Sequence, residues 1–339
     1  MMYVSAPQAN VRDHMSAVYN KVTTVYEGDA VEVLEKQKRA VHIRTKDGKD
    51  GWLEERYLVG QDVYDGFEKL RAENTRTQVE AHGTTRAELN IHLTPARDSD
   101  HLYQMKEGEK VGVLGRASAE KNTGAPKLKP IPSKGPVKKA ETPAPLTKKA
   151  AAEKAAEENE PPAMEDWWLI RDSRGHVGWV LARMVDIDVP VDVAQYAEGQ
   201  RITGYFILDT VQDGDKQVPQ YLVLMSQPKD GLPYDYDSIR VFSWDVKRHR
   251  YETAYRERNI WGVYPVTTGM EDFGKEGREP VFTIQVKDDT GAIVPRKFRM
   301  IQPVVRRVLL PGQNEKTEAK LAHPEAVKKE VAVKGKKKR

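Results

Sequence analysis

Hydrophobic and polar residues alternate in short runs over the N-terminal part of the chain. Val31 and Val33 are separated by one polar residue, and so are Val41 and Ile43. This period of two is typical of a β-strand that buries one face. The glycine-containing segment 46–49 follows the second run and favours a turn, because glycine adopts positive φ angles at little cost. The pattern therefore predicts short strands joined by tight turns.

A different period appears between residues 62 and 72. Val63, Phe67 and Leu70 follow one another at spacings of four and three, which places them on one face of a helix. We expect a short amphipathic helix there that packs against a neighbouring folded unit.

The strand pattern returns between residues 197 and 309. Aromatic and β-branched runs at 202–209 and 221–225 flank a turn at 213–215. Two further hairpins are expected, with strands at 239–244, 251–256, 281–287 and 297–301. Six or more strands in this region predict a β-sandwich or an open β-barrel.

The N-terminal part contains an internal repeat. Residues 9–12 (Ala-Asn-Val-Arg) recur at 89–92 (Leu-Asn-Ile-His), an offset of 80. The same offset relates Gly28–Leu34 to Gly108–Leu114. Because a missed repeat leads to the wrong fold, this duplication sets the expected organisation of the chain.

The offset changes inside the second copy. Residues 41–44 match 168–171 at an offset of 127, which then holds for the Gly-Trp pairs at 51–52 and 178–179. The difference between the two offsets is an insertion of 47 residues. Matches in the same order on both sides of one insertion are a strong signal of duplication.

The residues that recur form a recognisable motif. In the first copy they are Asn10, the glycine and valines of 28–34, and Asp47–Leu53, followed by Tyr57. This pattern resembles the bacterial SH3-like (SH3b) domain, and the second copy is similar although Met184 replaces the tyrosine. The resemblance implies a small five-stranded barrel for each copy, a fold that leaves few exposed sheet edges.

The chain is therefore expected to be mainly β. It should contain two small SH3-like barrels, the second with a long disordered insertion, and a C-terminal β-sandwich or open β-barrel domain. The expected boundaries are 1–60 for the first barrel, 61–86 for a helical linker, 87–187 for the second barrel with its disordered insertion at 115–163, 194–310 for the C-terminal domain and 311–339 for a disordered basic tail.

Charge is distributed unevenly along the chain. The net charge is +4, but outside residues 115–163 and 312–339 there are 36 basic and 41 acidic residues, a net charge of −5. A folded nucleic-acid-binding domain carries positive charge on its own surface, so this distribution argues against nucleic acid as a partner. The basic tail fits binding to an anionic surface and a solubilising role equally well.

The sequence lacks the residues that several enzyme classes need. It has no Cys, and its eight His include no pair at a metal-binding spacing. It also has no phosphate-binding glycine loop and no Gly-x-Ser-x-Gly motif. The cell-wall hydrolases that often accompany SH3b domains use a cysteine or paired histidines. We therefore predict that the protein is not an enzyme and binds no metal or cofactor.

By resemblance, an SH3-like barrel binds an extended ligand in a shallow groove lined by aromatic side chains. The candidate ligand-binding residues are Tyr19, Trp52 and Tyr57 in the first copy and Tyr103, Trp167 and Trp179 in the second. Trp52 and Trp179 fit a groove and a barrel core equally well. Trp167 is expected to be exposed, because it neighbours Trp168 and strand alternation turns only one of the two inward.

A basic cluster is expected at a hairpin tip. Lys247, Arg248 and Arg250 lie beside Trp244 and Tyr251, a combination that can hold phosphate or stack on bases. We favour a solvated tip with its aromatic rings on the core side, since the folded part of the chain is acidic overall.

These features predict a non-enzymatic binding or scaffold protein of the bacterial cell envelope. Its tandem barrels would bind peptidoglycan peptide or an extended segment of another envelope protein. The alternatives are a structural protein–protein interaction protein and a nucleic-acid binder that acts through the insertion and the tail.

The expected location follows from two further observations. No stretch approaches the roughly 18–20 apolar residues that span a membrane, and no leader is apparent after Met1. We expect the cell envelope, periplasm or exterior if a leader or lipid anchor precedes this sequence, and otherwise the cytoplasm.

Overall fold

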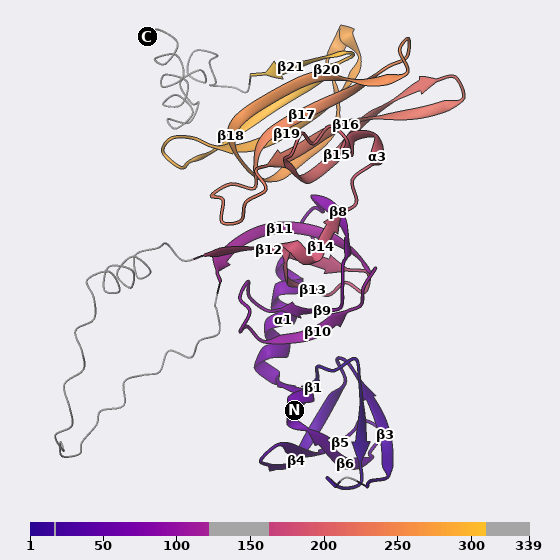
Figure 1. Ribbon diagram of the computed structural model, residues 1–339, viewed down its shortest axis with the longest axis vertical. Coiled ribbons are helices and arrows are strands. Elements are labelled where there is room, and N and C mark those ends of the chain that lie inside the picture. Colours follow the sequence, from indigo (N-terminus) through magenta and orange to yellow (C-terminus); the bar gives the residue numbers. More distant parts are fainter. Residues whose placement is uncertain (17, 122–162, 310–339) are drawn as a thin grey trace, which may run out of the picture.

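The computed structural model describes residues 1–16, 18–121 and 163–309. In this part of the chain, three seven-stranded antiparallel sheets follow one another along the long axis, in the order of the sequence (Figure 1). The prediction of a mainly β protein is confirmed. Most of the predicted insertion, at 122–162, and the predicted basic tail, from residue 310, lie outside the described residues.

The N-terminal sheet is a small barrel with strand order β3-β2-β6-β5-β4-β1-β7. Its elements are β1 (Met2–Val4), β2 (Gln8–Arg12), β3 (Lys21–Tyr26), β4 (Ala30–Gln37), β5 (Ala40–Arg44), β6 (Asp50–Glu54), the 3-10 turn η1 (Glu55–Tyr57) and β7 (Leu58–Gly60). In β5 alternate residues point inward, as the period of two predicts, but in β4 Val31 is buried and Val33 is 36% exposed. Val11, Ile43 and Leu53 are buried in its core. Gly51 stands where β6 passes close to β2, since a Cβ there would lie 2.7 Å from the carbonyl oxygen of Arg12.

The second sheet repeats this topology with the order β10-β9-β13-β12-β11-β8-β14. Its elements are β8 (Ala81–Thr85), β9 (Leu89–His92), β10 (His101–Met105), β11 (Lys110–Glu120), β12 (Met164–Asp172), β13 (Val177–Leu181), η2 (Ala182–Met184) and β14 (Val185–Ile187). The pairing register is repeated too: Arg12 opposes Trp52 in the first sheet, and His92 opposes Trp179 in the second. The structure therefore supports a second SH3-like barrel.

The predicted start of the insertion is corrected by this sheet. Residues 115–120 belong to β11, whose ladder with β12 pairs Gly115 with Leu169 and Glu120 with Met164. The small residues in this stretch have little strand preference of their own, so pairing with β12 decides their conformation.

The predicted amphipathic helix is present as α1 (Gln61–Glu73), with Val63 and Phe67 buried. It packs against the second barrel, where the ring of Phe67 meets Tyr103 edge-on at 5.4 Å. A second, one-turn helix, α3 (Val191–Ala194), leads into the C-terminal sheet. Neither described helix combines the length and the apolar character that a membrane crossing requires.

The C-terminal sheet is a meander in which each strand pairs with the next along the chain. Its elements are β15 (Arg201–Asp213), β16 (Lys216–Ser226), β17 (Tyr236–Asp245), β18 (Arg250–Asp272), η3 (Gly274–Glu276), β19 (Arg278–Lys287), β20 (Ile293–Ile301) and β21 (Val304–Val308). All three predicted hairpins are confirmed. One face carries a core to which all seven strands contribute, including Phe206, Phe282 and Val305.

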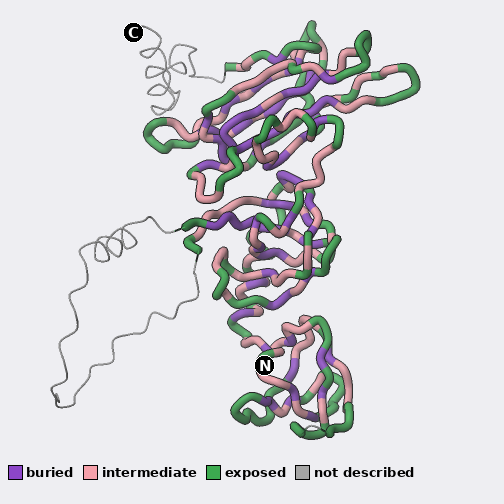
Figure 2. Tube along the Cα trace, viewed as in Figure 1, coloured by how far each residue is buried: buried purple, intermediate pink, exposed green. Residues whose placement is uncertain are grey.

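This sheet curls rather than lying flat. β15 contacts β18 and β19 across the core, so the sheet has the open, barrel-like form of the two arrangements predicted. Buried residues line the middle of each of the three sheets, and the ends of the C-terminal hairpins are exposed (Figure 2).

Candidate functional site

The outer face of the first barrel carries a row of aromatic and basic side chains. Arg12 in β2, Trp52 in β6 and His42 in β5 alternate with buried neighbours and so point outward. The register places them side by side, because Trp52 opposes both Arg12 and His42. Tyr19, from the loop between β2 and β3, extends this row, which we call the outer strip.

The contacts within the outer strip are specific. The guanidinium of Arg12 lies 4.1 Å from the centre of the Tyr19 ring, and the ring of His42 stacks on Trp52 at 4.8 Å. Such cation–π and stacking contacts hold the rings in place while leaving their edges and outer faces in water. Tyr19 is 36% exposed, and Trp52 is half-buried.

Tyr57, the third candidate of the first barrel, is half-buried in η1 beside the core. The guanidinium of Arg56 lies 4.8 Å from its ring centre and donates a hydrogen bond to its hydroxyl at 2.8 Å. No contact links Tyr57 directly to the outer strip among the described residues.

The candidates of the second barrel occupy different environments. Tyr103 is buried between Phe67 of α1 and the ring of His176, on which it stacks at 3.7 Å. Trp179 is half-buried and packs against an apolar cluster on the outer face of the sheet. Both rings are therefore covered at least in part by neighbouring side chains.

The prediction that Trp167 is exposed is wrong. Trp167 is 1% exposed and Trp168 is 2% exposed, so both faces of β12 are covered at this point. Strand alternation does hold, but the loop after β9 reaches back over the outer face. Arg97 in that loop binds Glu165, and the ring of His92 lies edge-on to Trp167 at 5.3 Å.

The basic hairpin tip is largely neutralised by neighbouring carboxylates. Arg248 and Arg250 both contact Glu252, at 2.6 and 2.9 Å. Trp244 meets the ring of Tyr251 edge-on at 4.9 Å and donates its indole N–H to Asp213 at 2.8 Å. This arrangement fits the solvated tip that we favour from the sequence.

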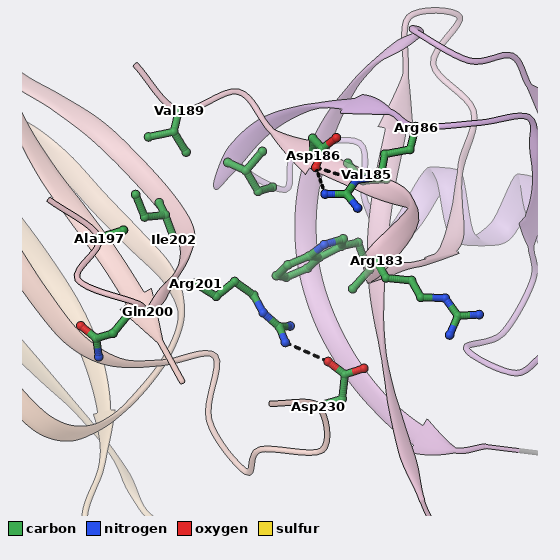
Figure 3. A pocket seen from close by; sticks show the side chains of 13 residues that line it. Arg86, Arg183, Val185, Asp186, Val189, Ala197, Gln200, Arg201, Ile202 and Asp230 are labelled. Atoms are coloured by element: carbon green, nitrogen blue, oxygen red, sulfur yellow. Dashed lines mark hydrogen bonds and ion pairs between the residues drawn. The ribbon is translucent and has the colours of Figure 1, made fainter. Parts of the chain in front are cut away.

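A pocket of about 410 Å³ lies between the second barrel and the C-terminal sheet. In Figure 3, Arg86 and Asp186 face each other on the barrel side, while Arg201 reaches Asp230 from the other side. The third guanidinium of the lining, Arg183, contacts a carboxylate beyond it at 3.3 Å. Each arginine of this pocket is therefore already paired, and we do not take the pocket as the primary site.

The junction around this pocket contains buried charges that the sequence does not reveal. Arg116 donates to Asp166 at 2.7 Å and to the carbonyl oxygen of Tyr234 at 2.6 Å. Burial raises the pKa of Asp166, but hydrogen bonds, led by that from Arg116, hold it below its ordinary value. Arg116 thus joins the second barrel to the C-terminal sheet.

Glu80 lies in the same junction, in the lining of a cavity that it shares with Arg116 and Asp235. It is 1% exposed, and its Oε2 accepts the backbone N–H of Val266 at 3.1 Å. Its Oε1 has no hydrogen-bond partner among the described residues. Burial raises the pKa of Glu80 to about 7, and repulsion from Asp235 adds to the shift. In the sequence Glu80 appears only as a linker residue.

No group of three or more metal-ligating side chains gathers anywhere in the described ranges 1–16, 18–121 and 163–309.

Comparison with solved structures gives weak matches to one class of protein. An NlpC/P60 family protein from Bacillus cereus matches with a TM-score of 0.22 and 10% identity, covering 92% of this chain and 95% of that one. NlpC1 from Trichomonas vaginalis matches with a TM-score of 0.17 and 12% identity over 90% of each chain. NlpC2 from the same organism matches with the same TM-score and identity over 91% of this chain and 94% of that one.

These matches contradict the predictions of a non-enzymatic binding or scaffold protein and of a chain that is not an enzyme, and we withdraw both. At this level of similarity no fold, activity or catalytic residue is transferred to the chain. Comparison with curated proteins gives no match.

A family model matches the first barrel. It is described as the bacterial SH3 domain and covers residues 7–59, the segment that carries the whole outer strip. The first copy of the repeat thus belongs to the bacterial SH3 domain family, while the second is supported by the structure alone.

Proposed function

We propose that the first barrel is a recognition module that holds this protein on cell-wall peptide in the bacterial envelope. Its outer strip is the binding surface. The proposal makes no statement about catalysis, and it assigns binding to one barrel rather than to both.

One observation carries the proposal: the aromatic face is open in the first barrel and covered in the second. Trp52 and the equivalent Trp179 are both half-buried, but Leu34 on the same outer face is 37% exposed, whereas the equivalent Leu114 is 4% exposed. Rigid aromatic rings give contact area at little cost in side-chain entropy, and the basic side chains that pack on them add hydrogen-bond donors. Both features suit a shallow peptide site. Membership of residues 7–59 in the bacterial SH3 domain family supports cell-wall peptide as the ligand.

Trp52→Ala tests the proposal by retention of the full chain on purified peptidoglycan sacculi. We expect the apparent affinity to fall about tenfold or more, because an aromatic anchor at the centre of a small site contributes much of its binding energy. The thermal midpoint should change little, since Trp52 lies on the outside of the barrel.

Tyr26→Ala is the matched control for this experiment. Tyr26 is 55% exposed and therefore as accessible to a ligand as the outer strip. It pairs with Gln8 at one end of β3, whereas Arg12 of the outer strip pairs with Lys21 at the other end. Its loss should leave retention unchanged. Equal retention of Trp52→Ala and the unmodified chain would show that the outer strip is not the binding surface.

A further inference from the structure

The outer face of the second barrel is occupied by the chain itself. Leu114, Leu169 and Val177 form a buried cluster there, covered by Leu70 of α1 and by Val79 from the segment that joins α1 to β8. An apolar patch that would otherwise face water is thus covered by a segment of about ten residues.

Arg171, on the same face, fixes this segment through its main chain. Its Nη2 donates to the carbonyl oxygen of Asn74, to that of Thr77 at 3.3 Å and to that of Thr75 at 3.5 Å. No side-chain charge of the segment takes part in these three contacts. The second barrel therefore shows how its outer face holds a peptide: by an apolar contact and by hydrogen bonds from one guanidinium to carbonyl groups.

The repeat identifies the corresponding residues of the first barrel. Leu34 corresponds to Leu114 and Arg44 to Arg171, and the registers agree, because Arg44 opposes Glu32 as Arg171 opposes Gly112. Leu34 is 37% exposed, whereas Leu114 is 4% exposed. The first barrel thus presents the same two anchoring groups without an occupant among the described residues.

Two substitutions on this face change what it accepts. A Cβ at Gly112 would lie 3.0 Å from Val79, so Glu32, at the equivalent position, fills the place that Val79 takes in the second barrel. Asp50 replaces Val177 and accepts two hydrogen bonds from Arg44, at 2.8 and 3.0 Å. A third nitrogen, Nη1, contacts Glu32 at 3.6 Å. Unlike the paired arginines of the pocket and the hairpin tip, Arg44 lies on a strand face with these contacts at one edge of its fork. They orient the guanidinium and leave one N–H of Nη1 and one of Nη2 for a ligand.

We propose that Arg44 binds main-chain carbonyl groups of the peptide ligand, while one apolar group of that ligand packs on Leu34 next to Trp52. This inference rests on the proposed function and names its ligand class. The ligand is an extended peptide with a small residue at the position that faces Glu32, recognised by its backbone rather than by its charge.

Retention of the full chain on sacculi at about 0.5 M NaCl tests this inference, because the Debye length there is below about 5 Å and surface charge attraction is screened. The unmodified chain should remain bound. Arg44→Gln should weaken binding about tenfold, the effect of losing hydrogen bonds from a charged donor. Arg44→Lys should restore little, since an ammonium lacks the planar fork of donors. Arg39→Gln, an equal charge change at the exposed β4–β5 turn, should bind as the unmodified chain does.

The outcomes separate this inference from the proposed function. If Trp52→Ala loses binding and Arg44→Gln keeps it, the ligand uses the outer strip without Arg44, and the inference is overturned while the function stands. Loss of binding in salt, or full rescue by Arg44→Lys, would show recognition of ligand charge and would also overturn it. If the unmodified chain is not retained even at low salt, the proposed function fails and this inference fails with it.

Discussion

Trp167→Ala should lower the free energy of unfolding by about 3–5 kcal/mol, the cost of removing a large buried aromatic side chain. Trp167 is 1% exposed, and its indole packs against the ring of His92 beneath the loop that Arg97 ties to Glu165. Urea unfolding followed by circular dichroism measures the change.

Trp52→Ala is the matched comparison, because it removes the same side chain from the other barrel. Trp52 lies on the outer strip, so its loss should cost less than about 1 kcal/mol of stability while weakening binding to sacculi. The opposite ranking, with Trp52 the more costly tryptophan to lose, would contradict the assignment of one face as open and the other as covered.

Glu80→Gln should abolish a large pH dependence of stability between about pH 4.5 and 7. The folded-state pKa of Glu80, about 7, lies above its ordinary value of 4.5, so folding favours the protonated carboxyl. The stability that protonation contributes is fully present below pH 4.5 and is lost as the pH rises through 7. A shift of this size corresponds to about 3 kcal/mol.

The measurement is urea unfolding of the unmodified chain and of Glu80→Gln at a series of pH values. The stability of the unmodified chain relative to the variant should fall by about 3 kcal/mol from pH 4.5 to pH 8. Parallel profiles would show that Glu80 keeps its ordinary pKa in the junction.

Glu165→Gln is a control, because the pKa of Glu165 is shifted in the opposite direction to that of Glu80. A hydrogen bond from Arg97 holds the pKa of Glu165 below its ordinary value of 4.5. The stability contributed by that carboxylate is therefore present above pH 4.5 and lost as the pH falls further. Its difference profile should change only at the acid end of the series.

The repeat makes much of the N-terminal fold predictable. Gly51 and Gly178 mark the close approach of two strands, and the alternation of Val41 and Ile43 identifies the inner face of β5. In β4 the alternation holds only for Val31, because Val33 is 36% exposed. The same reasoning fails for Trp167, because alternation predicts which side of a strand a residue faces but not whether a distant segment covers that side. The loop containing Arg97 provides this cover, and its path depends on tertiary contacts.

The candidate site is predictable in part for the same reason. Trp52 and Tyr19 are found from the aromatic positions of the motif, but Arg12 and His42 join them only once strand register is known. Arg44 is recognisable only by comparison with Arg171, whose carbonyl partners come from a segment outside the repeat.

The six tryptophan indole N–H signals of the full chain, observed by NMR during titration with soluble peptides released from sacculi, test the central claim most directly. Single Trp→Phe replacements assign the signals. We predict that the Trp52 signal shifts progressively, while those of Trp167, Trp168 and Trp179 stay in place. A shift at Trp179 with Trp52 unmoved would contradict the claim that the first barrel is the open one.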